Sequence, residues 1–69
     1  MVKQRAGEKM RFLRRSLGLS QGRVAQELGL TQPRISQWES GAAKLENQRT
    51  GKVAKLAALL GTTVEELLA

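Results

Sequence analysis

The sequence predicts a compact all-α domain of five helices, and two observations favour this class. Apolar residues recur at intervals of three and four along most of the 69 residues, and no segment alternates apolar and polar residues as a strand does. Glycines follow four of these apolar stretches, where helices commonly end, at positions 18, 29, 41 and 61. The length is that of one domain, so residues 1–69 are expected to form a single domain.

The first two helices are predicted from short apolar repeats. Residues 7–17 carry Met10, Leu13 and Leu17 at the spacing of one helical face. Residues 21–28 carry Val24 and Leu28 one turn apart. Both segments are expected to turn these residues toward a common core.

Capping residues mark the starts of the second and third helices. Ser20 precedes the second helix and Thr31 precedes the third, each at the N-cap position. Pro33 falls in the first turn of the third helix, where a missing N–H costs little because the first amides have no intrahelical acceptor. This helix is expected to run to about Ser40 and to stop at Gly41.

Two further helices are expected after a loop. Residues 42–49 show no apolar face and are predicted to form that loop, with at most one helical turn. Thr50 is expected to cap a fourth helix, whose apolar face comprises Val53, Leu56, Ala57 and Leu60. Thr63 and Glu66 have the spacing of a capping box. The box would open a fifth helix carrying Val64, Leu67 and Leu68.

Positive charge is concentrated in the N-terminal part of the chain. Twelve lysines and arginines against six acidic residues give a net charge of +6. Residues 1–40 hold eight of the basic residues and three of the acidic ones, a net charge of +5. Such a field favours nucleic acid as the partner over an anionic membrane or an acidic protein.

The composition leaves little for catalysis, metal binding or membrane insertion. The chain has no cysteine and no histidine, which removes thiolate ligands and the commonest general base. An enzyme is therefore the poorest fit, and no catalytic residue, metal or cofactor is predicted. No run approaches the roughly 20 apolar residues of a membrane span, and no apolar run follows the charged N-terminus as in a signal peptide. A soluble, cytoplasmic protein is expected.

The second and third helices are predicted to form a helix-turn-helix over residues 21–40. Only three residues separate them, so the chain must turn sharply, and Gly29 can adopt the positive φ that such a turn needs. Ala25 is small enough to lie where the two helices cross. Ile35 and Trp38 would then face back toward the second helix.

The same region resembles a known family. The stretches "GLSQ" at 18–21, "LGLTQ" at 28–32 and "ISQWESG" at 35–41 resemble the Cro and repressor (XRE) family of small bacterial and phage regulators, and the resemblance covers nearly the whole chain. It implies the five-helix fold of lambdoid phage repressors, with the third helix in the major groove of double-stranded DNA. It further implies a sequence-specific transcriptional regulator, most simply a repressor. Such a protein would act as a homodimer on a near-palindromic operator with half-sites roughly 34 Å apart.

The resemblance also implies roles for individual residues. Base edges would be read by Gln32, Pro33, Arg34 and Gln37. Phosphates would be bound by Ser20, Gln21, Arg23, Thr31, Lys44, Arg49 and Lys52. The motif would be held together by Ala25, Gly29, Ile35 and Trp38, and by an ion pair between Arg14 and Glu39.

One segment departs from the family pattern. The stretch from Gly41 to Leu56 is longer than is usual in relatives and lacks the proline common there. In the family this loop touches phosphates and helps to shape the dimer contact. The dimer surface is expected to come from this loop and the fifth helix, with Leu45, Leu67 and Leu68 exposed in the monomer unless they fold back onto their own core.

Several alternatives stay open at the level of the sequence. The physiological partner of the DNA-binding domain could be a protein, as in an antitoxin bound to its toxin or a restriction–modification controller protein. A pure protein-interaction module would use none of the predicted base readers, whose side chains would then form an ordinary solvated helix face. Arg34 either clamps a guanine or contacts only a phosphate.

Overall fold

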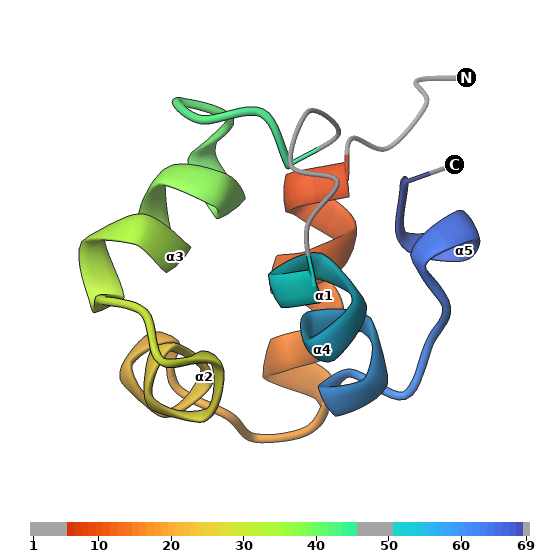
Figure 1. Cartoon of the computed structure of the whole chain (residues 1–69), viewed down its shortest axis with the longest axis horizontal. Coiled ribbons are helices and arrows are strands. Elements are labelled where there is room, and N and C mark those ends of the chain that lie inside the picture. Colours follow the sequence, from red (N-terminus) through yellow and green to blue (C-terminus); the bar gives the residue numbers. More distant parts are fainter. Residues whose placement is uncertain (1–5, 46–50, 69) are drawn as a thin grey trace.

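Five α-helices account for most of the chain in a computed structural model that describes residues 6–45 and 51–68. They are α1 (Ala6–Ser16), α2 (Gln21–Leu28), α3 (Gln32–Ser40), α4 (Gly51–Leu59) and α5 (Val64–Leu68) (Figure 1). No strand occurs within these described ranges. The prediction of an all-α fold is confirmed, and α1 begins and ends one residue earlier than expected. The expected cap at Thr50 lies outside the described residues.

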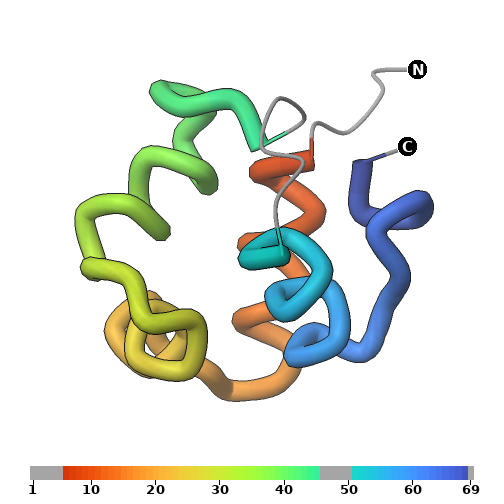
Figure 2. Tube along the Cα trace, in the orientation of Figure 1, coloured from red at the N-terminus to blue at the C-terminus, as the bar shows by residue number. Residues whose placement is uncertain are grey.

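The helices surround α1 and α4. In the view of Figure 2, α2 and α3 lie on one side and α5 on the other, with α4 in front of α1. The pairs in contact include α2 with α3, α1 with α3, α1 with α5, and α4 with both α2 and α5. Every helix contributes to one core, whose largest fully buried side chains are Met10, Val24, Leu28, Ile35, Leu45, Val53, Leu56 and Leu67. None of the helices in the described part of the chain is long and apolar enough to cross a membrane.

A glycine allows α1 to lie directly on the C-terminal end of α3. A Cβ atom at Gly7 would overlap the carbonyl oxygen of Trp38 and would lie 3.0 Å from that of Glu39. Only a residue without a side chain permits this approach of the two backbones. The close contact fixes where α3 sits relative to the rest of the domain.

The predicted apolar face of α1 is wrong at its end. Met10 is fully buried and Leu13 is half-buried, but Leu17 is 53% exposed. The helix ends at Ser16, and the amide of Leu17 bonds the carbonyl oxygens of Leu13 and Arg14 in the turn that follows. Leu17 thus stays exposed at the end of α1, and the half-buried Leu19 packs against the core instead.

Two residues expected to be exposed for dimerisation are buried instead. Leu45 and Leu67 are each 1% exposed, and Leu68 is half-buried. The apolar side chains of α5 and of the loop after α3 fold back onto the core, because a domain this small needs them there. The expectation that these leucines form an exposed dimer surface is wrong for Leu45 and Leu67.

The capping box at the start of α5 is formed in half. The amide of Glu66 donates to Thr63 Oγ1 at 3.1 Å, as the box requires. The carboxylate of Glu66 accepts from the hydroxyl of Thr62 at 3.0 Å. The structure thus pairs Glu66 with the neighbouring threonine and gives no bond from its carboxylate to the amide of Thr63.

Candidate nucleic-acid interface

The turn between α2 and α3 depends on Gly29. Its φ and ψ are 69° and 31°, in the left-handed region that favours glycine. The amide of the next residue, Leu30, bonds the carbonyl oxygen of Ala25 at 2.8 Å and closes the end of α2. Ala25 is 3% exposed, and a larger side chain would separate the two helices there. Sequence and structure agree on the tight turn at this point.

The side chains of α3 divide into an anchored face and an exposed face. Ile35 is fully buried and Trp38 is 3% exposed, so both hold α3 on the core. The indole N–H of Trp38 has no hydrogen-bond partner in the described part of the chain. The exposed side chains on the same helix include all four predicted base readers, Gln32, Pro33, Arg34 and Gln37.

A buried ion pair ties α1 to the end of α3, as the sequence predicts. Arg14 Nε donates to Glu39 Oε2 at 2.6 Å, and Arg14 Nη2 donates to Glu39 Oε1 at 3.1 Å. The third contact of the guanidinium runs from Nη1 to the carbonyl oxygen of Leu19 at 2.7 Å. The two side chains are 9% and 3% exposed. This bidentate geometry fixes the rotation of α3 about its axis.

Two glutamines extend this ion pair toward the exposed face. Gln21 Nε2 donates to Glu39 Oε1 at 3.0 Å, and Gln32 Nε2 donates to Gln21 Oε1 at 3.0 Å. The side chain of Gln32 is thereby held in one orientation at the start of α3. Sequence reasoning named each of these residues but missed the chain of bonds between them. The sequence holds little sign of these hydrogen bonds, because the spacing of Gln21 and Gln32 does not show that their side-chain amides meet.

The N-terminus of α2 presents amides and a polar cap. Ser20 has the extended backbone of an N-cap, and its Oγ accepts from the amide of Arg23 at 3.0 Å. The amides of Gln21 and Gly22 lie in the same first turn, where helices have no internal acceptor. The exposed Arg23 side chain pairs with Glu27 at 3.2 Å.

Thr31 caps α3 through its backbone alone. Its φ and ψ of −97° and 154° are those of an N-cap, but its side chain makes no capping bond. Pro33 has no amide hydrogen to donate, and the amide of Arg34 bonds the carbonyl oxygen of Thr31 at 3.1 Å. The expected side-chain cap is therefore absent, and Thr31 is exposed.

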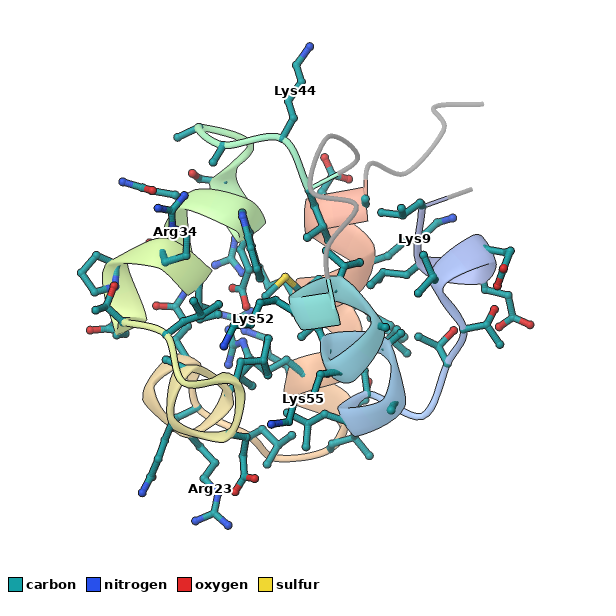
Figure 3. All side chains as sticks on the ribbon, viewed as in Figure 1. Lys9, Arg23, Arg34, Lys44, Lys52 and Lys55 are labelled. Atoms are coloured by element: carbon teal, nitrogen blue, oxygen red, sulfur yellow. The ribbon has the colours of Figure 1, made fainter. Side chains whose placement is uncertain are left out.

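The remaining predicted phosphate contacts are not all in one place. Lys44 is exposed on the loop after α3, and its side chain extends outward (Figure 3). Lys52 Nζ donates to the carbonyl oxygen of Leu28 at 2.7 Å, at the opposite end of α2 from Ser20. Arg49 lies outside the described residues.

Comparisons with known proteins agree with this geometry. Residues 10–67 match the helix-turn-helix family. The chain is similar to the P22 c2 repressor, solved in complex with synthetic operator 9T, with a TM-score of 0.86 and 26% identity over 96% of each chain. It is also similar in fold to the biofilm regulator SinR, solved in complex with DNA, with a TM-score of 0.81 and 23% identity over 93% of this chain and 98% of that one. No curated protein sequence matches.

An enzyme shares the fold over part of its length. Hydroxypropylphosphonic acid epoxidase from S. wedmorenis aligns with 93% of this chain at 22% identity and a TM-score of 0.77, but only 32% of the enzyme is covered. At that identity the likeness shows the fold alone. The matched family and the repressor-like fold support a DNA-binding transcriptional regulator. The chain belongs to the helix-turn-helix family, and its resemblance to the Cro and repressor type is confirmed.

Proposed function

We propose that the protein is a sequence-specific transcriptional repressor whose α3 enters the major groove of double-stranded DNA. The observation that carries this proposal is the division of α3 into two faces. One face is fixed by Ile35, Trp38 and the Arg14–Glu39 ion pair. The other presents exposed side chains with paired donors and acceptors, which is what direct reading of base edges requires.

Gln32 is the best placed of the proposed base readers. Its Nε2 already donates one hydrogen to Gln21, which leaves a second hydrogen on Nε2 and both lone pairs of Oε1. Adenine offers an acceptor at N7 and a donor at N6 in the major groove. Gln32 can therefore bind adenine through two hydrogen bonds without breaking its bond to Gln21, so its orientation is set before DNA arrives.

The other exposed residues of α3 complete the proposed reading surface. Gln37 lies about a turn and a half further along and offers the same pair of groups to a second base. The ring of Pro33 can pack against a thymine methyl group. The exposed guanidinium of Arg34 can clamp a guanine at O6 and N7 or bind a phosphate.

Phosphate contacts would come chiefly from the N-terminus of α2. Its first-turn amides and the helix dipole attract an anion, and the half-buried Gln21 keeps one Nε2 hydrogen beyond its bond to Glu39. Around this N-terminus and the start of α3 lie Ser20, Arg23 and Thr31, whose hydroxyl makes no capping bond. Lys44 would contact the backbone from the far end of α3. Lys52, which bonds Leu28, is the weakest of the proposed contacts.

The proposed active form is a homodimer on a near-palindromic operator. One recognition helix meets only a few base pairs, so two copies are needed for a site long enough to be rare. A two-fold symmetric dimer would place its two α3 helices in major grooves roughly 34 Å apart. Occupation of such an operator at a promoter would repress transcription.

Selection of bound duplexes from a random DNA pool tests this function. We expect enrichment of two inverted half-sites with centres about one helical turn apart. The enriched sequence would show adenine opposite the position of Gln32. Failure to enrich any motif, with a folded protein at low salt, would contradict the proposal.

A further inference from the structure

Phe12 places a large apolar side chain in solvent on the outer side of α1. It is the only phenylalanine of the chain, and it is 63% exposed. Two open hollows flank its ring. One, of about 560 Å³, is lined by Glu8, Arg11, Phe12, Arg15 and Ser16. The other, of about 250 Å³ between α1 and α5, is lined by Lys9, Phe12, Leu13, Thr62, Glu66 and Leu67.

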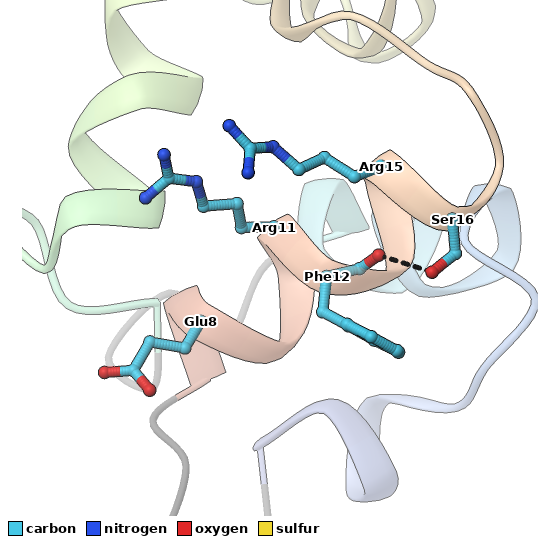
Figure 4. A pocket seen from close by; sticks show the side chains of 5 residues that line it. All are labelled: Glu8, Arg11, Phe12, Arg15 and Ser16. Atoms are coloured by element: carbon cyan, nitrogen blue, oxygen red, sulfur yellow. Dashed lines mark hydrogen bonds between the residues drawn. The ribbon is translucent and has the colours of Figure 1, made fainter.

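Two arginines border the larger hollow. Arg11 and Arg15 are exposed and one helical turn apart, and Figure 4 shows their side chains extending together from α1 while the ring of Phe12 points elsewhere. Neither guanidinium has a hydrogen bond or ion pair within the described ranges, whereas Arg14 and Arg23 each pair with a glutamate. The larger hollow is therefore lined both by two guanidinium groups without an ion pair among the described residues and by the exposed ring of Phe12.

We propose that this outer face of α1 (Glu8, Arg11, Phe12, Arg15 and Ser16) docks an acidic amphipathic helix of a protein partner. Acidic residues one turn apart on the partner would lie at the spacing of Arg11 and Arg15, where each guanidinium can bind a carboxylate with two hydrogen bonds. Apolar residues on the same helix would cover Phe12 and enter the adjoining hollows, in the manner of a helix bound in a groove. Charge complementarity selects an acidic partner, since two of the three charged groups in the larger hollow are cationic.

The observations favour a protein over nucleic acid as the occupant. A phosphate backbone would satisfy the two guanidinium groups but would leave the ring of Phe12 in water. The position of Phe12 on the helix also separates it from the reading surface. It lies two residues before Arg14 and five after Gly7, the two residues through which α1 meets α3, so it points away from that contact.

Glu8 gives the docking surface a direction. Its carboxylate lies on the same hollow, about one turn before Arg11 and two turns before Arg15, and has no ion pair within the described residues. A partner helix that is acidic at one end and neutral or basic at the other would be favoured with its acidic end at Arg15. Because Phe12 points away from α3, a partner helix bound over it would leave α3 available for DNA, and the inference goes beyond the proposed repressor function.

Titration of the full chain with a synthetic peptide tests the proposal. The probe is a helical peptide with leucines along one face and glutamates along the face directly beside it, and its control is a scrambled peptide of the same composition. Amide chemical shifts in the NMR spectrum should change saturably at the outer face of α1 with the probe alone. We expect Phe12→Ala to weaken binding of the probe by about tenfold, as the loss of a central aromatic anchor does. Arg11→Gln and Arg15→Gln should each weaken it severalfold, while Lys55→Gln on α4 should not.

Other outcomes would overturn the inference. Equal binding of the scrambled peptide, or unchanged binding by Phe12→Ala, would show that no specific helix site exists. Loss of duplex DNA affinity in Arg11→Gln and Arg15→Gln, with the probe bound as before, would assign this face to phosphates instead. Phe12 is exposed, so its alanine variant should keep its fold and its affinity for DNA. Measuring both affinities separates failure of this inference from failure of the repressor proposal.

Discussion

Arg14 and Glu39 are the residues whose contacts constrain the proposed reading surface most directly. Glu39 accepts from Arg14 and Gln21, and Gln21 accepts from Gln32, so one buried carboxylate orients a residue on the exposed face. Removing one partner of a buried ion pair leaves an uncompensated charge, which costs far more than the pair itself contributes.

Glu39→Gln should therefore be strongly destabilising. It keeps the shape of the side chain but leaves Arg14 without its counter-charge, and we expect the free energy of unfolding to fall by about 3 kcal/mol. Glu27→Gln is the matched control, because it removes the exposed carboxylate paired with Arg23 and should change stability by less than about 0.5 kcal/mol. Urea denaturation measures both. Similar losses in the two variants would contradict the role given to the buried pair.

Trp38 contributes through packing rather than through hydrogen bonding. Because its buried Nε1 has no partner among the described residues, Trp38→Phe removes an unsatisfied donor together with part of a ring. We expect it to reduce the free energy of unfolding by about 1 kcal/mol, whereas Trp38→Ala should cost about 3–5 kcal/mol. A loss in Trp38→Phe as large as that in Trp38→Ala, measured by thermal or urea unfolding, would show that the indole N–H has a partner.

At the scale of elements, the helix-turn-helix was the most predictable part of the molecule. The sequence of Ala25, Gly29, Ile35 and Trp38 sets the spacing, and each residue has the burial or backbone conformation expected of it. The approach of α1 to α3 could not be predicted, because a glycine in a helix does not reveal which backbone lies against it. Leu17 was misplaced because a helical pattern does not show where the last turn ends.

The two glycines of the motif should respond oppositely to alanine. Gly29→Ala forces a side chain into the left-handed region and should lower the free energy of unfolding by about 1–2 kcal/mol. Gly22→Ala lies inside α2 with its nearest neighbour, Ser20 Oγ, at 3.9 Å from the added Cβ, and should raise stability by about 0.5–1 kcal/mol. Equal effects in chemical denaturation would mean that the turn tolerates another backbone conformation.

For the whole molecule, the net charge of +6 predicts DNA binding that weakens steeply with salt. Each phosphate neutralised adds about 0.9 to the slope of log affinity against log salt concentration. Lys44→Gln should reduce that slope by about 0.9, while Lys55→Gln, on α4, should leave it unchanged. Fluorescence anisotropy with a labelled duplex gives both slopes. Identical slopes for the two variants would remove Lys44 from the proposed interface.

Composition and the spacing of apolar residues predicted the fold better than they predicted which residues the fold leaves exposed. The number and order of helices followed from apolar periodicity and caps, which are local properties. Burial of Leu45 and Leu67 depends instead on how the loop after α3 and the last helix close the core, and exposure of Phe12 depends on which side of α1 the other helices cover. The dimer surface was therefore predicted at residues that the core buries. The hydrogen bonds of Gln21 to Glu39 and Gln32 could not be predicted, because they depend on how α2 and α3 pack against each other.

In the proposed complex, α3 reads base sequence through Gln32 and Gln37. The most direct measurement is the ratio of affinities for the selected duplex and for an unrelated duplex of equal length. Gln32→Ala and Gln37→Ala should each reduce this ratio by about tenfold or more, because a bidentate contact is worth about 1–3 kcal/mol of discrimination. Gln26→Ala, an exposed glutamine on α2, should leave it unchanged. An unchanged ratio in both α3 variants would contradict the account.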